Sequence, residues 1–300
     1  MGRCRVEKHV TPRDNKEWII TGMADQNVTR AGIAWQKTVE EEHAQSDRIR
    51  EEFASDDFWK PVAHRFVPSK KGEASQDDTV ERLAELITRE QTVLDVGAGG
   101  GRLTIPLAEY CEHVTAVEPS EAMREQLIAT AKGWDVQNIE VVASRWEETV
   151  VEPHDLVVCA HVVYTVTDIE GFIRKLTNAA RRTVALISFE RPATATYLPL
   201  WSYVHGEERI ELPTLPQIEK LLPEMGIDHQ KKLLQEWAPR PFKSREQALV
   251  ECQARLFINP GSEKSEMLSD VLEDSLESVE GGFRLKWAEP HRPLIISWGV

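Results

Sequence analysis

From residue 77 onward, short apolar runs alternate with stretches in which apolar residues recur at helical spacing. Five of these runs predict buried strands, over 92–96, 114–117, 139–142, 155–160 and 183–189. Ser120 precedes one of the amphipathic stretches in the position of a helix cap. Because strand and helix alternate, the pattern predicts a doubly wound α/β fold with a mostly parallel sheet.

The regions on either side of this repeat differ from it. Residues 1–76 predict an N-terminal helical cap segment, with one helix over about 29–52, whereas 77–300 predict the main domain. The aromatic, proline-bounded stretch of about 191–213 is too irregular for a core element. We therefore expect an insertion there, directly after the fifth strand.

Local signals place a few further elements. Asp78 followed by Glu81 predicts a capping box at the start of a helix. A helix over about 215–225 and a strand near 228–236 would continue the sheet. The last two apolar runs predict an antiparallel hairpin, over 283–287 and 294–298.

One motif carries chemical information. The segment VLDVGAGGGRL (93–103) places Gly97, Gly99 and Gly101 between a buried strand and a helix, where glycine allows positive φ and close approach of a ligand. Asp95 lies just before the turn, and Glu118 ends the next strand, in position to accept hydrogen bonds from a ribose. Arg102 replaces the third glycine of a dinucleotide fingerprint, which argues against a nicotinamide-dependent oxidoreductase.

DVGAGGG followed by AVEPS (116–120) resembles the first two motifs of the class I S-adenosylmethionine-dependent methyltransferases. The resemblance covers about 78–190. It implies a seven-stranded, Rossmann-like sheet and S-adenosylmethionine as the cofactor. It also implies three parts of a cofactor site: a loop that binds the methionine portion, a carboxylate that binds the ribose, and residues beside the adenine. The residues of this site would be Asp95, Gly97, Ala98, Gly99, Gly101, Glu118, Pro119, Ser120, Met123 and Ala160.

The chain departs from the family after its third strand. Many members carry an acidic residue there for the adenine amino group, but this chain has ASRWEE (143–148). Ser144 or a backbone group beside Arg145 would have to substitute. Trp146 either stacks on the purine or is a structural tryptophan under the sheet, and the sequence leaves both interpretations open.

In this architecture the acceptor lies at the carboxyl ends of the fourth and fifth strands, which points to His161, Tyr164 and Glu190. His161 is a candidate proton acceptor or a structural histidine. Aromatic residues of the insertion either line the acceptor pocket or only pack the lid: Trp201, Tyr203 and His205. Others in the N-terminal segment cover the pocket or belong to the core: Trp35, Phe58, Trp59 and Phe66.

The composition of the chain disfavours several classes of binding partner. The net charge of −14 and the pI of about 5.2 disfavour nucleic acid and anionic membranes. No apolar run would span a bilayer and no signal peptide is evident, so we expect a cytoplasmic protein. The four cysteines suggest neither a disulfide framework nor a metal site, and no metal is expected.

The absence of a D/N-P-P-Y motif and of a magnesium-binding carboxylate cluster favours a small-molecule methyl acceptor. A non-catalytic regulatory module that binds S-adenosylmethionine is the alternative function. The oligomeric state is not predicted.

Overall fold

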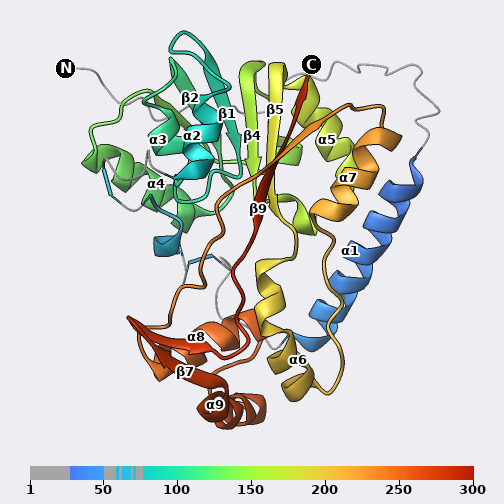
Figure 1. The fold of residues 1–300 in the computed structure, drawn as a ribbon, viewed down its shortest axis with the longest axis vertical. Helices are drawn as coiled ribbons and strands as arrows, with labels where there is room; N and C mark the ends of the chain where they lie inside the picture. The colour runs from blue at the N-terminus through green and yellow to red at the C-terminus, as the bar shows by residue number, and fades with distance from the viewer. Residues whose placement is uncertain (1–27, 51–58, 61–62, 69, 72–76) are drawn as a thin grey trace, which may run out of the picture.

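The computed structural model describes residues 28–50, 59–60, 63–68, 70–71 and 77–300, and it contains a seven-stranded sheet in the order β3-β2-β1-β4-β5-β9-β6 (Figure 1). Neighbouring strands from β3 to β5 are parallel, whereas β9 is antiparallel to both β5 and β6. The strands are β1 (Thr92–Val96), β2 (His113–Val117), β3 (Ile139–Val142), β4 (His154–Ala160), β5 (Ala180–Phe189), β6 (Gln230–Leu233) and β9 (Pro293–Gly299). The predicted fold class is confirmed.

Helices cover both faces of the sheet because β1 to β5 are apolar on both sides (Figure 1). One face packs on α1 (Arg30–Ile49), α5 (Ile169–Asn178) and α7 (Leu215–Glu224). The other face packs on α2 (Asp78–Ala84), α3 (Thr104–Leu107) and α4 (Glu121–Gly133).

A smaller group of elements lies beyond the ends of β4 and β5, at the bottom of Figure 1. We call it the lobe, residues 193–205 and 242–288. It has an apolar core of its own that includes Trp201, Cys252 and Leu268. Its elements are η5 (Ala193–Tyr197), α6 (Leu198–His205), α8 (Arg245–Leu256), α9 (Glu263–Ser275), β7 (Leu276–Val279) and β8 (Gly282–Leu285).

Strand direction fixes where the lobe sits relative to the sheet. β9 runs from the lobe to the C terminus, and β5 runs antiparallel to it. The carboxyl ends of the parallel strands, which we call the carboxyl edge, therefore face the lobe. In doubly wound folds this edge is where ligands bind.

Three local predictions were wrong. Asp77, not Asp78, caps α2, because Asp77 has extended backbone and its Oδ1 accepts from the Thr79 N–H at 2.9 Å. The stretch 191–213 is not irregular throughout, since it contains α6, whose Leu200 and Trp201 are buried.

The predicted hairpin at the C terminus was also wrong. The first run forms β8, which pairs with β7, and the second forms β9, which inserts between β5 and β6. Each run is a strand, but its partner lies elsewhere in the chain. The helix predicted over 29–52 is shorter at both ends, as α1.

Candidate functional site

The glycine-rich loop after β1 has backbone φ angles that residues with a side chain rarely adopt. Gly97, Gly99 and Gly101 have φ angles of +73°, +56° and +88°. A Cβ on Gly97 would lie 2.3 Å from Cγ2 of Val162, and a Cβ on Gly101 would lie 2.9 Å from Cδ1 of Ile105. Packing as well as φ therefore requires glycine at 97 and 101.

Gly99 differs from the other two because space lies in front of it. A Cβ there would meet only Sδ of Met123, at 3.9 Å, and Cβ of Phe66, at 4.0 Å. A ligand can therefore approach the main chain at Gly99 between β1 and α4. Ala98, the residue before it, is buried.

Asp95 is a buried carboxylate at the carboxyl end of β1, with an exposed fraction of 2%. Its Oδ2 accepts a hydrogen bond from the Thr104 hydroxyl at 2.6 Å. Burial raises the pKa of Asp95 to about 6, while the Thr104 hydrogen bond and the charge of Arg102 oppose this shift. A cation placed nearby would favour the ionised form.

Glu118 follows β2 and connects it to the glycine loop. Its Oε2 accepts from the Gly99 N–H at 2.8 Å, and its Oε1 accepts from the Ser120 N–H at 2.8 Å. The Ser120 hydroxyl in turn accepts from the Met123 N–H at 3.2 Å and caps α4. These contacts fix the orientation of a buried carboxylate directly beside Gly99.

The residues predicted for the adenine side have different surroundings. Pro119 follows Glu118 directly and is exposed, whereas Met123 is buried, with its Sδ 3.9 Å from a Cβ built on Gly99. Ser144 is half-buried and Arg145 is exposed. Trp146 belongs to the apolar core, and the Lys175 ammonium lies 4.8 Å from its ring centroid. Its Nε1 is shielded from solvent and has no hydrogen-bond partner among the described residues, so both interpretations of Trp146 stay open.

The N-terminal segment reaches the glycine loop through residues 63–68, which include η1 (Ala63–Arg65). A Cβ on Gly100 would lie 2.8 Å from the Phe66 carbonyl oxygen, so Phe66 lies directly over the loop. Trp59 packs edge-on against the Phe66 ring at 5.5 Å. Trp35 instead belongs to the core, where its Nε1 donates to the Val166 carbonyl at 2.7 Å. Phe58 lies outside the described residues.

His161, which follows β4 and the half-buried Ala160, has a left-handed backbone with φ of +59°. This conformation is uncommon for a residue with a side chain, and it places the imidazole at the carboxyl edge. The ring stacks on Phe189 at 4.1 Å, and its Nδ1 lies 3.0 Å from the Tyr164 hydroxyl. Its Nε2 is shielded from solvent and has no hydrogen-bond partner among the described residues.

The Tyr164 hydroxyl accepts from the Phe189 N–H at 3.1 Å and lies 3.0 Å from Nδ1 of His161. If Nδ1 of the neutral ring carries the proton and donates to this hydroxyl, Nε2 has a lone pair for a ligand. If the hydroxyl donates to Nδ1 instead, Nε2 carries the proton. Burial, with the charge of Arg102, lowers the pKa of His161 to about 3, so its ring is neutral at pH 7.

The other acceptor-side residues do not join His161. Glu190 is exposed, and its main chain bonds to Arg292 and Thr214. Trp201 and His205 pack inside the lobe, which matches the lid interpretation. Tyr203 is 52% exposed.

The structure adds three residues that the sequence analysis did not assign to the acceptor side. Trp237 lies 5.3 Å from the His161 ring, and His291 lies 5.3 Å from the Phe189 ring. The guanidinium of Arg102 lies 4.7 Å from the Trp237 centroid and donates to Asp77 at 2.6 Å. No local motif marks Trp237 or His291, because they meet β4 and β5 only through the tertiary fold.

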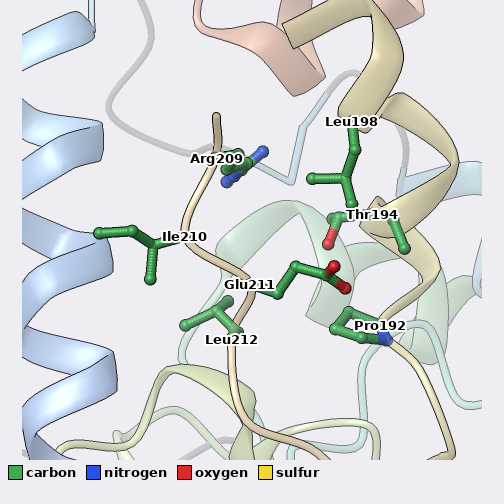
Figure 2. A pocket seen from close by; sticks show the side chains of 8 residues that line it. Pro192, Thr194, Leu198, Arg209, Ile210, Glu211 and Leu212 are labelled. Atoms are coloured by element: carbon green, nitrogen blue, oxygen red, sulfur yellow. The ribbon is translucent and has the colours of Figure 1, made fainter. Parts of the chain in front are cut away.

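Figure 2 shows a small cavity between η5, the start of α6 and the segment 209–212. Its volume of about 10 Å³ suits one water molecule rather than a substrate. Glu211 extends toward Pro192 and Thr194 in this view, and it also pairs with Arg191 at 3.1 Å. This cavity is therefore not the acceptor pocket.

Residues 93–183, which contain the glycine loop, Glu118 and His161, match the family model described as a methyltransferase domain. This segment therefore matches a methyltransferase domain, and together with the fold it agrees with the predicted class I S-adenosylmethionine-dependent methyltransferase and its cofactor.

Solved structures share the fold at low sequence identity. The YcgJ protein of Bacillus subtilis is 15% identical, with a TM-score of 0.50, over 74% of this chain and 97% of that one. A presumed methyltransferase of Bacillus halodurans C-125 is also 15% identical, with a TM-score of 0.50, over 74% and 96%. Among curated proteins, none matches the sequence.

Among the described residues, no helix is both long and apolar enough to cross a membrane. No group of three or more histidine, cysteine or acidic side chains there is arranged to hold a metal ion.

Proposed function

We propose that this methyltransferase modifies an oxygen, nitrogen or carbon atom of a small molecule held between the carboxyl edge and the lobe. The observation that carries the proposal is the Nε2 of His161, a shielded nitrogen without a hydrogen-bond partner among the described residues. A buried polar atom without a partner is costly, and a ligand that bonds to it offsets that cost. The left-handed backbone of His161 adds a second cost at the same position.

The cofactor portion of the proposal is supported by the residues around Gly99. The bare main chain there leaves room for the amino-acid portion of the cofactor, and the buried Asp95 carboxylate suits its ammonium group. Glu118 is oriented for the ribose hydroxyls by two backbone donors. Pro119 and Met123 would border the adenine. When bound, the cofactor supplies an electrophilic methyl group on a sulfonium.

His161 would orient the acceptor through Nε2. In the tautomer with its proton on Nδ1, the neutral imidazole offers the Nε2 lone pair to a hydroxyl of the acceptor. Because burial lowers the pKa of His161 to about 3, the ring is a weak base, and it would receive the proton only as methylation makes that hydroxyl strongly acidic. Tyr164 is a positioning residue in this proposal, because its hydroxyl holds Nδ1. Aligning the acceptor and excluding water are the protein's main contributions to a displacement of this kind.

The net charge of the chain and the position of the lobe support a small molecule as the methyl acceptor. The chain carries a net charge of −14, which opposes long-range attraction of a nucleic acid. The lobe lies beyond the carboxyl edge of the sheet (Figure 1).

A label-transfer experiment tests this proposal. The protein is incubated with methyl-labelled S-adenosylmethionine and a cell extract separated into small-molecule, RNA and protein fractions. We expect label in the small-molecule fraction. Label confined to RNA or protein would overturn the small-molecule assignment, and absence of label from every fraction would favour a non-catalytic module.

Two variants then assign roles. Glu118→Ala should weaken S-adenosylhomocysteine binding at least about tenfold by calorimetry, because each lost charge-assisted hydrogen bond contributes roughly 1.5–3 kcal/mol. His161→Asn keeps a residue that tolerates left-handed backbone and should lower turnover while leaving this affinity unchanged. His113→Asn, a surface histidine on β2, is the matched control. Equal turnover of His161→Asn and wild type would contradict the role of His161.

A further inference from the structure

We propose that a cationic cavity beside the glycine loop binds an oxyanion, a carboxylate or phosphate, on the methyl acceptor. This inference rests on the proposed function and specifies its substrate class. The cavity has a volume of about 330 Å³, within the range of small-molecule sites. It is lined by His64, Arg65, Val67, Pro68, Asp77, Arg102 and Arg240.

Among the described residues, one of the three guanidinium groups that line this cavity has no carboxylate partner. Arg102 pairs with Asp77 at 2.6 Å, and Arg65 pairs with Glu251. Arg240 donates to the Arg65 carbonyl at 3.0 Å, but among the described residues no carboxylate lies within ion-pair distance of it. Three guanidinium groups thus meet in a chain of net charge −14, and an anion would supply the missing partner.

Guanidinium groups are suited to this ligand class. Their planar donors match the two oxygens of a carboxylate or phosphate, and such charge-assisted pairs are stronger than neutral hydrogen bonds. Arg240 is exposed and so can reach an incoming ligand, whereas Arg102 is held by Asp77 and by the Trp237 ring.

Trp237 links this cavity to His161. Arg102 lines the cavity and lies 4.7 Å from the Trp237 centroid, and the Trp237 ring lies 5.3 Å from that of His161. One small molecule could therefore place its oxyanion against the guanidinium groups and its reacting atom near Nε2 of His161. The aromatic face of Trp237 would separate these two polar ends.

The cofactor's own carboxylate is the competing occupant. Arg240 belongs to the connection between β6 and the lobe, and it follows Trp237 rather than the glycine loop. If the cavity serves the acceptor, replacing Arg240 should leave cofactor affinity unchanged. A loss of S-adenosylhomocysteine affinity in Arg240→Gln would overturn the proposal.

Calorimetry on the full chain, saturated with S-adenosylhomocysteine, provides the direct test. Inorganic phosphate and succinate are titrated separately, so that the two arms distinguish a phosphate from a carboxylate site. We expect saturable binding of at least one probe, weakened roughly ten- to hundredfold in Arg240→Gln. Arg182→Gln, which removes one exposed arginine on β5, should bind as wild type does.

The outcomes separate the two proposals. No saturable binding of either probe, or equal binding to wild type and Arg240→Gln, would overturn the oxyanion site and leave the methyl-transfer proposal standing. If S-adenosylhomocysteine itself does not bind, the proposed function fails. The same titrations on the ligand-free protein would still decide whether the cavity binds an anion.

Discussion

Alanine substitutions at Gly97 and Gly99 should separate folding from cofactor binding within one loop. Both residues have positive φ, which costs roughly 1–2 kcal/mol for a residue with a Cβ. Only Gly97 adds a clash, because its Cβ would lie 2.3 Å from Cγ2 of Val162. Overpacking of this kind costs about 1–3 kcal/mol, so Gly97→Ala should lose roughly 2–5 kcal/mol of unfolding free energy.

Gly99→Ala should show the opposite balance. Its Cβ would meet nothing closer than 3.9 Å, so the loss of stability should be limited to the φ cost. The same methyl group would occupy the space in which a ligand approaches the main chain. We therefore expect its S-adenosylhomocysteine affinity to fall by at least about tenfold.

Urea denaturation of Gly97→Ala, Val162→Ala and the double variant measures the clash directly. Removing the Val162 methyl groups should restore part of the stability of Gly97→Ala, giving a favourable coupling energy of about 1–3 kcal/mol. Additive effects would refute the argument from packing. Equal loss of stability in Gly97→Ala and Gly99→Ala would refute it as well.

Two further predictions concern buried charges. Burial raises the Asp95 pKa from 3.8 to about 6. Between these two pH values the folded protein therefore holds a proton that the unfolded chain has released. The free energy of unfolding should fall as pH rises through this window, by at most about 3 kcal/mol. Denaturation of wild type and Asp95→Asn from pH 4 to 7 should show that difference, and parallel curves would contradict it. Glu42 and Arg209 form a buried pair at 2.8 Å, so Glu42→Ala should cost about 3–5 kcal/mol. Glu41→Ala, in the exposed pair with Lys37, should change unfolding by under about 1 kcal/mol, and similar losses in both variants would count against the burial argument.

The sequence predicted the parts of the fold that depend on short-range patterns. The runs at 92–96 and 139–142 have the strand boundaries expected of them, because a buried parallel strand is a continuous apolar run between turn residues. The turn at Gly97 to Gly101 was predictable for the same reason, since its constraints lie within a few residues.

Strand partners and the composition of the acceptor side depend on long-range contacts that no local pattern records. β9 pairs Gly299 with Thr183, and the continuous apolar run of β9 is equally compatible with a hairpin. Trp237 likewise meets His161, and His291 meets Phe189, only through the tertiary fold. The misplaced cap at Asp78 has a different cause, because two adjacent aspartates offer the same side chain and only the backbone conformation distinguishes them.

Two of the chain connections between the sheet and the lobe couple the lobe to His161. Trp237 lies on the outgoing connection and His291 on the returning one, and their main chains exchange two hydrogen bonds of 2.9 Å. The Trp237 ring contacts both His161 and Phe189, at 5.3 and 5.4 Å. A displacement of the lobe would therefore move the ring that packs against the proposed proton acceptor. Because Arg240 lies on the same outgoing connection, the oxyanion site and His161 would hold a fixed separation only while the lobe stays docked on the sheet.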